Sequence, residues 1–185
     1  MKPFRVETGL VATLLRADVD TDQIIPKQFL KRIERAGFGE CLFHDWRSDP
    51  NFSLTPGATI LVTGRNFGCG SSREHAVWAL ADAGFRAILA PSFADIFASN
   101  CVNNGVLTIA LDESVVNDLA QRERLTIDLE RCEVRDDAGL RVTFTIDPFR
   151  RRRLLEGLDE IGLTLQYEGA IAVYERTRGR QALDS

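Results

Sequence analysis

The sequence lacks any apolar run of the roughly 20 residues that a membrane-spanning helix needs. Its first segment, MKPFRVETGLVATLL, has an acidic residue at Glu7 and an apolar part that is too short for a signal peptide. It also has no internal repeat and no low-complexity tract. From these absences we expect a cytoplasmic protein that does not enter a membrane.

The sequence is poor in cysteine and has no surplus of basic residues. Its four cysteines stand far apart without a CxxC pair, which argues against a zinc knuckle or a thioredoxin-like site and favours reduced thiols. With 23 Lys and Arg against 27 Asp and Glu, the net charge of -4 gives no reason to expect nucleic acid as a partner. The one basic run, Arg150–Arg153, would point all round a helix, so we expect it to be solvated or to lie in an interface.

What the sequence does contain is an alternation of apolar patterns, from which we predict one α/β domain over residues 1–185. Short β-branched or apolar runs predict buried strands, and apolar residues at helical spacing predict helices. The predicted strands are 10–15, 58–64, 85–90 and 106–111, and the predicted helices are 73–84, 91–105 and 113–123. This order favours a mixed, partly parallel sheet flanked by helices.

The last third of the chain changes character. Residues 125–147 alternate polar and apolar side chains around DDAG, which predicts a β-hairpin. Asp147 followed by Pro148 is typical of a capped helix start. We also predict closing helices over 149–163 and 164–177, a loose tail over 178–185, loops over 16–26 and 47–57, and a short helix with a turn over 27–46.

The segment GRNFGCGSSREHA, residues 64–76, allows two interpretations. In the structural one, Ser71 and Glu74 form a capping box: the serine hydroxyl accepts from the Glu74 amide, and the glutamate reaches back. On spacing alone, this interpretation is favoured, and the loop would do no more than start the predicted helix.

The second interpretation is a ligand site. Gly68 and Gly70 flank Cys69, so the backbone can turn sharply and approach a ligand closely. Amides at a helix start, with Arg73 beside them, suit a carboxylate or phosphate. The segment is neither a Walker loop nor a G-x-S-x-G elbow. An activated thiolate at Cys69 is a minor alternative.

Four separate motifs resemble the aconitase superfamily. GRNFGCGSSREHA is similar to its GSSRE loop, and DVDTDQIIP, residues 18–26, is similar to a second signature. APSFADIF (90–97) and FTIDPFRRRRLLEGLDEIGLTLQ (144–166) narrow the resemblance to the family of bacterial 3-isopropylmalate dehydratase small subunits. The similarity runs over nearly the whole chain.

This resemblance implies a swivelling β/β/α domain that closes over the active site of a large partner subunit. The family resemblance places a [4Fe-4S] cluster on three cysteines of that partner and no cofactor on this chain. The implied reaction removes water from the dicarboxylate 2-isopropylmalate and returns it one carbon away, giving 3-isopropylmalate for leucine biosynthesis. The chain is therefore expected to be a hydro-lyase subunit that is active only with its partner.

The resemblance also implies roles for individual residues. Ser71 matches the catalytic base and Arg73 the group that grips a substrate carboxylate, with Ser72 as a hydrogen-bonding neighbour. Thr21 and Asp22 match a T-D pair near the substrate. The loop backbone of the implied site is Gly68, Cys69 and Gly70. One departure is Val77, which stands where the family often has proline and is harmless early in a helix.

The segment 27–43 corresponds to a region that helps to decide the side group of the substrate in this superfamily. Phe29 and Leu30, with Ile33, offer apolar contacts that an isopropyl group needs. Lys31, Arg32 and Arg35 suit an additional carboxylate equally well, so the sequence leaves both open. The alternatives are a related small subunit for homoaconitate or a methylmalate, and a non-catalytic anion-binding module.

Overall fold

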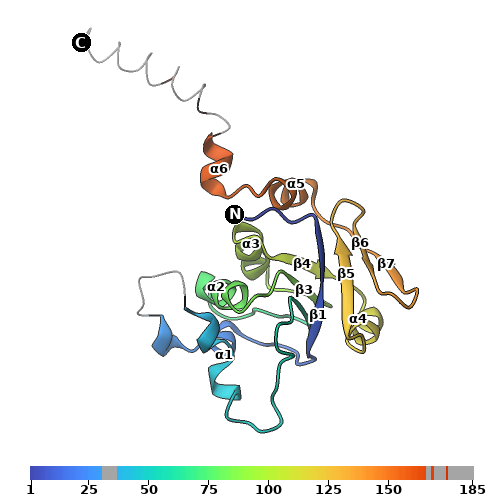
Figure 1. Ribbon diagram of the computed structural model, residues 1–185. Helices are drawn as coiled ribbons and strands as arrows, with labels where there is room; N and C mark the ends of the chain where they lie inside the picture. Colours follow the sequence, from blue (N-terminus) through green and yellow to red (C-terminus); the bar gives the residue numbers. More distant parts are fainter. Residues whose placement is uncertain (31–36, 166–167, 169–173, 175–185) are drawn as a thin grey trace, which may run out of the picture.

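The computed structural model describes residues 1–30, 37–165, 168 and 174, and a mixed sheet forms its centre (Figure 1). Within this part of the chain, seven strands follow the order β4-β3-β2-β1-β5-β6-β7. The parallel strands are β1 (Val6–Leu14), β2 (Ile60–Thr63), β3 (Ala87–Ala90) and β4 (Leu107–Ala110). The antiparallel strands are β5 (Arg124–Asp128), β6 (Glu133–Arg135) and β7 (Arg141–Thr143). The predicted mixed, partly parallel sheet is confirmed.

Helices cover both faces of this sheet. The described α-helices are α1 (Thr21–Ile24), α2 (Glu74–Asp82), α3 (Asp95–Asn103), α4 (Glu113–Leu119), α5 (Pro148–Glu156) and α6 (Glu160–Leu165). Three short 3-10 turns, η1 (Lys27–Phe29), η2 (Gly39–Cys41) and η3 (His44–Trp46), lie between α1 and β2. None of these helices has the length and apolar character to cross a membrane.

Neighbouring residues of the central strands pack into two separate hydrophobic cores. Leu61 of β2 packs into the core under α1 and α2, whereas Ile60 and Val62 pack into the core under α4 and α5. All four residues of β2 and of β3 are buried. A strand that is covered on both faces is mostly apolar, which explains the run ILV at residues 60–62.

The structure extends the predicted first strand toward the N-terminus. Its second half, Val11–Leu14, pairs in parallel with β2, while Val6–Leu10 pairs antiparallel with β5. Val6 and Thr8 are exposed, Glu7 is partly buried and Gly9 is buried, so the apolar pattern of residues 6–9 is weak. The strand therefore begins four residues earlier than predicted because pairing with β5, 110 or more residues away, decides it.

Two predictions need correction, and two others fall partly outside the described residues. The predicted loop 16–26 contains α1, which Asp20 and Gln23 start with a reciprocal capping box. Residues 27–46 contain the three 3-10 turns, and residues 31–36, where the predicted short helix would lie, are outside the described residues. The predicted helix 149–163 is broken at Gly157, whose left-handed backbone ends α5. Of the predicted helix 164–177 only 164, 165, 168 and 174 are described, and the tail 178–185 lies outside the described residues.

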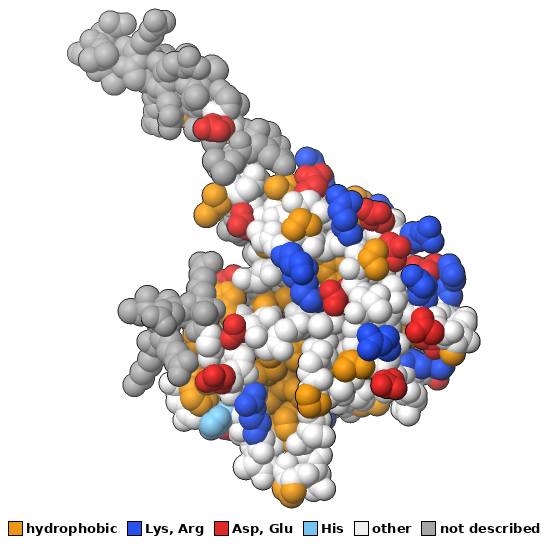
Figure 2. All heavy atoms as spheres, in the orientation of Figure 1, with side chains coloured by type: hydrophobic (Ala, Val, Ile, Leu, Met, Phe, Trp, Pro, Cys, Tyr) orange, Lys and Arg blue, Asp and Glu red, His pale blue; other side chains and the backbone are white. Residues whose placement is uncertain are grey.

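The arginine run on α5 has structural partners. Arg151 donates to the backbone carbonyls of Leu129 and Glu130, Arg152 pairs with Glu156, and Arg153 donates to the Asn103 side chain. On the face shown in Figure 2, basic and acidic side chains are mixed over the region of α5 and β5–β7. The arginine side chains therefore bind neighbouring backbone and side-chain groups, and they form no uniformly basic patch on this face.

One side chain ties α2 to α3. The Asn104 amide nitrogen donates to the Glu74 carboxylate at 2.8 Å and to the Asn100 carbonyl oxygen, and its oxygen accepts from the Trp78 indole at 3.1 Å. Removal of this amide leaves two partly buried groups without their hydrogen bonds.

We expect Asn104→Ala to lower the free energy of unfolding by about 2 kcal/mol, because one of the lost hydrogen bonds is to a charged group. Asn117→Ala, on the exposed side of α4, is the control and should stay within about 0.5 kcal/mol of wild type. Urea unfolding of both variants measures the difference. Equal stabilities for the two variants would contradict the assignment.

Candidate functional site

Three loops meet at the carboxyl ends of the parallel strands. They are residues 15–20 after β1, 64–73 after β2 and 91–94 after β3. In open parallel sheets, ligands bind at this edge. The glycine-rich segment of the sequence forms the middle loop.

Backbone hydrogen bonds join the middle loop to both neighbours. The Gly68 amide donates to the Val19 carbonyl at 2.8 Å, and the Thr21 amide donates to the Cys69 carbonyl at 3.0 Å. On the other side, the Ala94 amide donates to the Phe67 carbonyl at 3.1 Å. The loop is therefore held like a short strand between two others, which fixes the side chains that follow it.

Glycine is required at two points of this loop. Gly68 has φ +77° and Gly70 has φ +88°, both in the left-handed region. A Cβ atom at Gly68 would also overlap the ring of Phe97 from α3, which itself packs edge-on against Phe67. The bare glycine thus lets α3 approach the loop closely. The predicted sharp turn is present, and the approach to a ligand stays a prediction.

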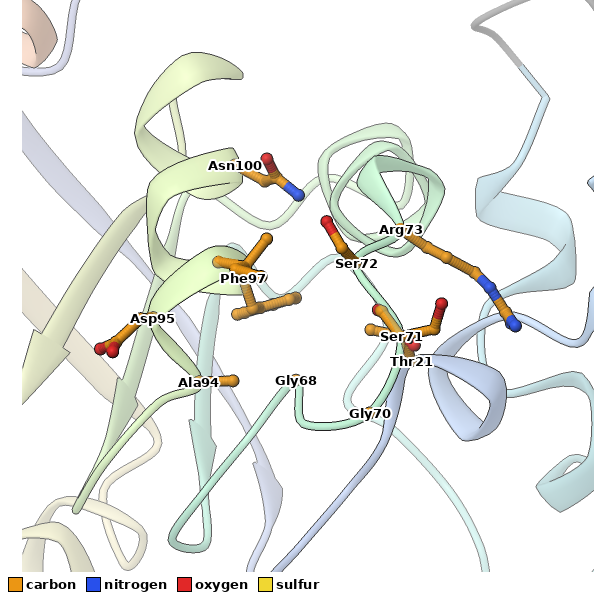
Figure 3. Close-up of a pocket in the computed structure, with 11 residues that line it drawn as sticks. Thr21, Gly68, Gly70, Ser71, Ser72, Arg73, Ala94, Asp95, Phe97 and Asn100 are labelled. Carbon is orange, nitrogen blue, oxygen red and sulfur yellow. Dashed lines mark hydrogen bonds between the residues drawn. The ribbon is translucent and has the colours of Figure 1, made fainter.

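A cleft of about 250 Å³ opens between this loop and α3. Figure 3 shows Ser72 of the loop and Asn100 of α3 pointing toward each other across it. The lining residues are Thr21, Gly68, Gly70, Ser71, Ser72, Arg73, Ala94, Asp95, Ile96, Phe97 and Asn100. The structure therefore brings together Thr21 and most of the glycine-loop residues singled out in the sequence.

The predicted capping box at Ser71 is wrong. Helix α2 begins at Glu74, its N-cap is Arg73, and no side chain caps it. The Glu74 carboxylate accepts from Asn104 instead of reaching back, and the Ser71 carbonyl accepts from the Thr21 hydroxyl at 3.0 Å. Ser71 is held in the loop by its backbone, so its exposed hydroxyl is available to a ligand in the cleft.

Arg73 forms an ion pair with Asp22 of α1, and Lys27 lies 3.5 Å from the other oxygen of that carboxylate. Partial burial acts to raise the pKa of Asp22, but the hydrogen bond and charge of Arg73, with the charge of Lys27, outweigh it and hold the pKa below its ordinary value. In Figure 3 the Arg73 side chain runs toward α1 and away from α3. Asp22 thus fixes Arg73 through one nitrogen, Nη1.

The raised pKa of Cys69 argues against a role for its thiol as a nucleophile. Burial raises the pKa of the Cys69 thiol, and the charges of Asp20 and Asp18 raise it further. A thiol with a raised pKa carries little thiolate. Cys69 serves the loop through its backbone, which forms a bridge to Asp20.

Phe29 and Leu30 do not line the cleft in the described structure. Both pack against the core under α1 and α2, and the Phe29 ring lies 4.8 Å from that of His44. That they contact a substrate stays a prediction. His75 of α2 packs against the rings of Phe38 and Trp78.

Six residues at this site were not predicted from the sequence. Lys27 contacts the Asp22 carboxylate, and the other five line the cleft on the side of α3: Ala94, Asp95, Ile96, Phe97 and Asn100. Asn100 stands just beyond the motif APSFADIF, and its helical spacing gave no sign of which neighbour it faces.

Among the described residues, no three His, Cys, Asp or Glu side chains come together, so they do not fit a metal ion or cluster.

Three family models match successive parts of the chain. The Aconitase C-terminal domain matches residues 50–114, and LeuD_N matches 118–148. The C-terminal domain of the 3-isopropylmalate dehydratase small subunit matches 160–182. The first of the three contains the whole glycine-rich loop and α3.

Named relatives match over almost the full length. The 3-isopropylmalate dehydratase small subunit of Geobacillus kaustophilus is 58% identical, covering 95% of this chain and 97% of its own. That of Koribacter versatilis is 55% identical, covering 95% and 98%. A solved structure of 3-isopropylmalate dehydratase from Methanocaldococcus jannaschii is similar with a TM-score of 0.71 and 27% identity, covering 92% of this chain and 99% of that one.

We expect Gly68→Ala to unfold at a much lower denaturant concentration than wild type, because the methyl group adds overlap with Phe97 to the cost of positive φ. Gly139→Ala is the matched control: it has φ +100° but open space around it, so it should lose only about 1–2 kcal/mol. Chemical unfolding of both variants separates the two costs. If Gly68→Ala loses no more than the control, α3 does not depend on this contact.

Proposed function

The chain belongs to the family of 3-isopropylmalate dehydratase small subunits, and we propose that with a large subunit it interconverts 2-isopropylmalate and 3-isopropylmalate by dehydration and rehydration. The observation that carries the proposal is that Ser71, Ser72 and Arg73 all line one cleft at the carboxyl edge of the sheet, from which the Arg73 side chain runs toward α1. Hydroxyls and a guanidinium on a rigid loop suit a hydroxy dicarboxylate.

Ser71 is the proposed base. Elimination of water needs a group that takes the proton from the carbon beside the one that carries the hydroxyl. A serine hydroxyl does this only as an alkoxide, which needs positive potential around it. The N-terminus of α2 follows three residues later without a side-chain cap, and Arg73 adds a full charge. The same serine can return the proton to the other carbon.

Arg73 is the proposed carboxylate-binding group, with Asp22 as its support. Asp22 engages Nη1, which leaves the edge of Nε and Nη2 for a bidentate carboxylate. Because Asp22 is in turn paired with Lys27, its charge is partly balanced. Thr21 holds the Ser71 carbonyl and so fixes the base relative to Arg73. Ser72 supplies a second hydroxyl at the cleft.

The partner subunit is proposed to complete the site. The cleft between the glycine-rich loop and α3 has a volume of about 250 Å³, and the partner would supply a further wall over it. We also propose that the partner holds a [4Fe-4S] cluster, which would supply the Lewis acid that a poor hydroxyl leaving group needs. The described residues of this chain offer no ligand set for it.

The first test is reconstitution. We expect the chain alone to have no dehydratase activity, and the complex with an iron–sulfur large subunit to interconvert the two isopropylmalates under anaerobic conditions. Absorbance of the unsaturated intermediate and separation of the two products measure the reaction. Homoaconitate and 2-methylmalate serve as parallel substrates, and a clear preference for either would replace isopropylmalate in the proposal. Activity of the chain alone would refute the need for a partner.

The second test is Ser71→Ala. We expect turnover of the complex to fall by roughly 10²–10⁴-fold, as for loss of a general base. The free energy of unfolding should stay within about 0.5 kcal/mol of wild type, since Ser71 does not cap α2. Ser72→Ala is the matched control and should retain more activity. If Ser72→Ala shows the larger loss, the base is Ser72.

A further inference from the structure

Helix α3 carries three asparagines close together, Asn100, Asn103 and Asn104, the last of them the C-cap of the helix. Two of these side chains hold the fold together. Asn104 binds Glu74 and Trp78, and the Asn103 oxygen accepts from Arg153 at 2.8 Å. Each of these contacts ties α3 to another helix, so both side chains have a structural purpose.

Asn100 differs from its two neighbours. Among the described residues, its side-chain amide has no hydrogen-bond partner, although it is partly buried. Its backbone carbonyl accepts from the Asn104 side chain at 2.8 Å, which fixes this turn of the helix. Figure 3 shows its side chain directed into the cleft, toward Ser72 on the opposite wall. This amide is therefore open to the cleft and has its hydrogen-bonding groups available to a ligand that enters there.

The α3 wall of the cleft has few other polar groups. Besides Asn100 it consists of Ala94, Asp95, Ile96 and Phe97, and the Asp95 side chain points away from the cleft in Figure 3. Among the described residues of this wall, Asn100 alone carries a side-chain N–H group. The Phe97 ring of this wall packs directly against Gly68 of the loop.

We propose that Asn100 is a substrate-binding residue that donates its Nδ2 hydrogens to the second carboxylate of the substrate. The inference rests on the proposed function, in which Arg73, whose side chain runs from the loop toward α1, binds the first carboxylate. An amide is suited to this place because it offers two N–H donors without a charge. The dicarboxylate then spans the cleft, with its reacting carbons between the two walls and beside Ser71.

The test uses Asn100→Ala and the isosteric Asn100→Asp in the reconstituted complex with 2-isopropylmalate. Loss of one hydrogen bond to a charged group should raise KM roughly 10- to 100-fold with a smaller change in kcat. Asn100→Asp should be worse than Asn100→Ala at alkaline pH, because it places a negative charge opposite the carboxylate. Its KM should recover toward mildly acidic pH, where the introduced carboxyl is protonated and can donate.

Two controls separate binding from structure. Asn104→Ala should lower the melting temperature while KM stays near wild type, and the Asn100 variants should do the reverse. Two monocarboxylic hydroxy acids, each lacking one carboxylate of the substrate, are measured as competitive inhibitors. The inhibitor that lacks the carboxylate contacted by Asn100 should bind equally well to wild type and to Asn100→Ala.

An unchanged KM in both Asn100 variants overturns the proposal, as does a loss of melting temperature equal to that of Asn104→Ala. A KM for Asn100→Asp that does not depend on pH relative to wild type also counts against it. If instead the wild-type complex does not turn over isopropylmalate, the proposed function fails, which is a different result from a normal wild type with unaffected variants.

Discussion

The site depends on the contact between the Phe97 ring and the bare Cα of Gly68. Because no side chain stands at Gly68, α3 can lie directly against the loop that follows β2. Backbone hydrogen bonds to Val19 and Ala94 hold the same loop on its two sides. A loop fixed in this way presents its serines at a defined distance from α3, so the cleft is preorganised before any ligand enters.

The charges at the site follow from the same arrangement. The loop carries Arg73 to the start of α2, where Asp22 of α1 binds it, and Lys27 balances the carboxylate. This chain of charges lies on one side of the cleft, while the α3 wall is apolar apart from Asn100 and the outward-pointing Asp95. The two walls therefore suit the two ends of a hydroxy dicarboxylate differently, one through a cation and the other through a neutral donor.

Ser71 shows how a local rule and the fold can disagree. Its spacing to Glu74 is that of a capping box, and a local rule alone would start the helix there. In the fold, the bridge between Asp20 and Cys69 and the bond from Thr21 hold residues 69–71 as part of the loop, and α2 starts three residues later. The true capping box is at Asp20 and Gln23, in a segment predicted as a loop because its apolar pair is too short to show a period.

The sequence by itself determined the order of strands and helices from β2 to β4, the mixed sheet, and the glycine loop with its serines and Arg73, because each of these rests on a local pattern or a contiguous motif. Only the tertiary structure decided which residues the loop meets. The pairing of Val6–Leu10 with β5, the Asp22–Arg73 ion pair and the cleft face of Asn100 all join residues about 50 or more positions apart, or depend on how a helix is turned. A rule that uses only the local sequence cannot distinguish Asn100 from Asn103 and Asn104. The packing of α3 against the loop places Asn100 alone of the three at the cleft.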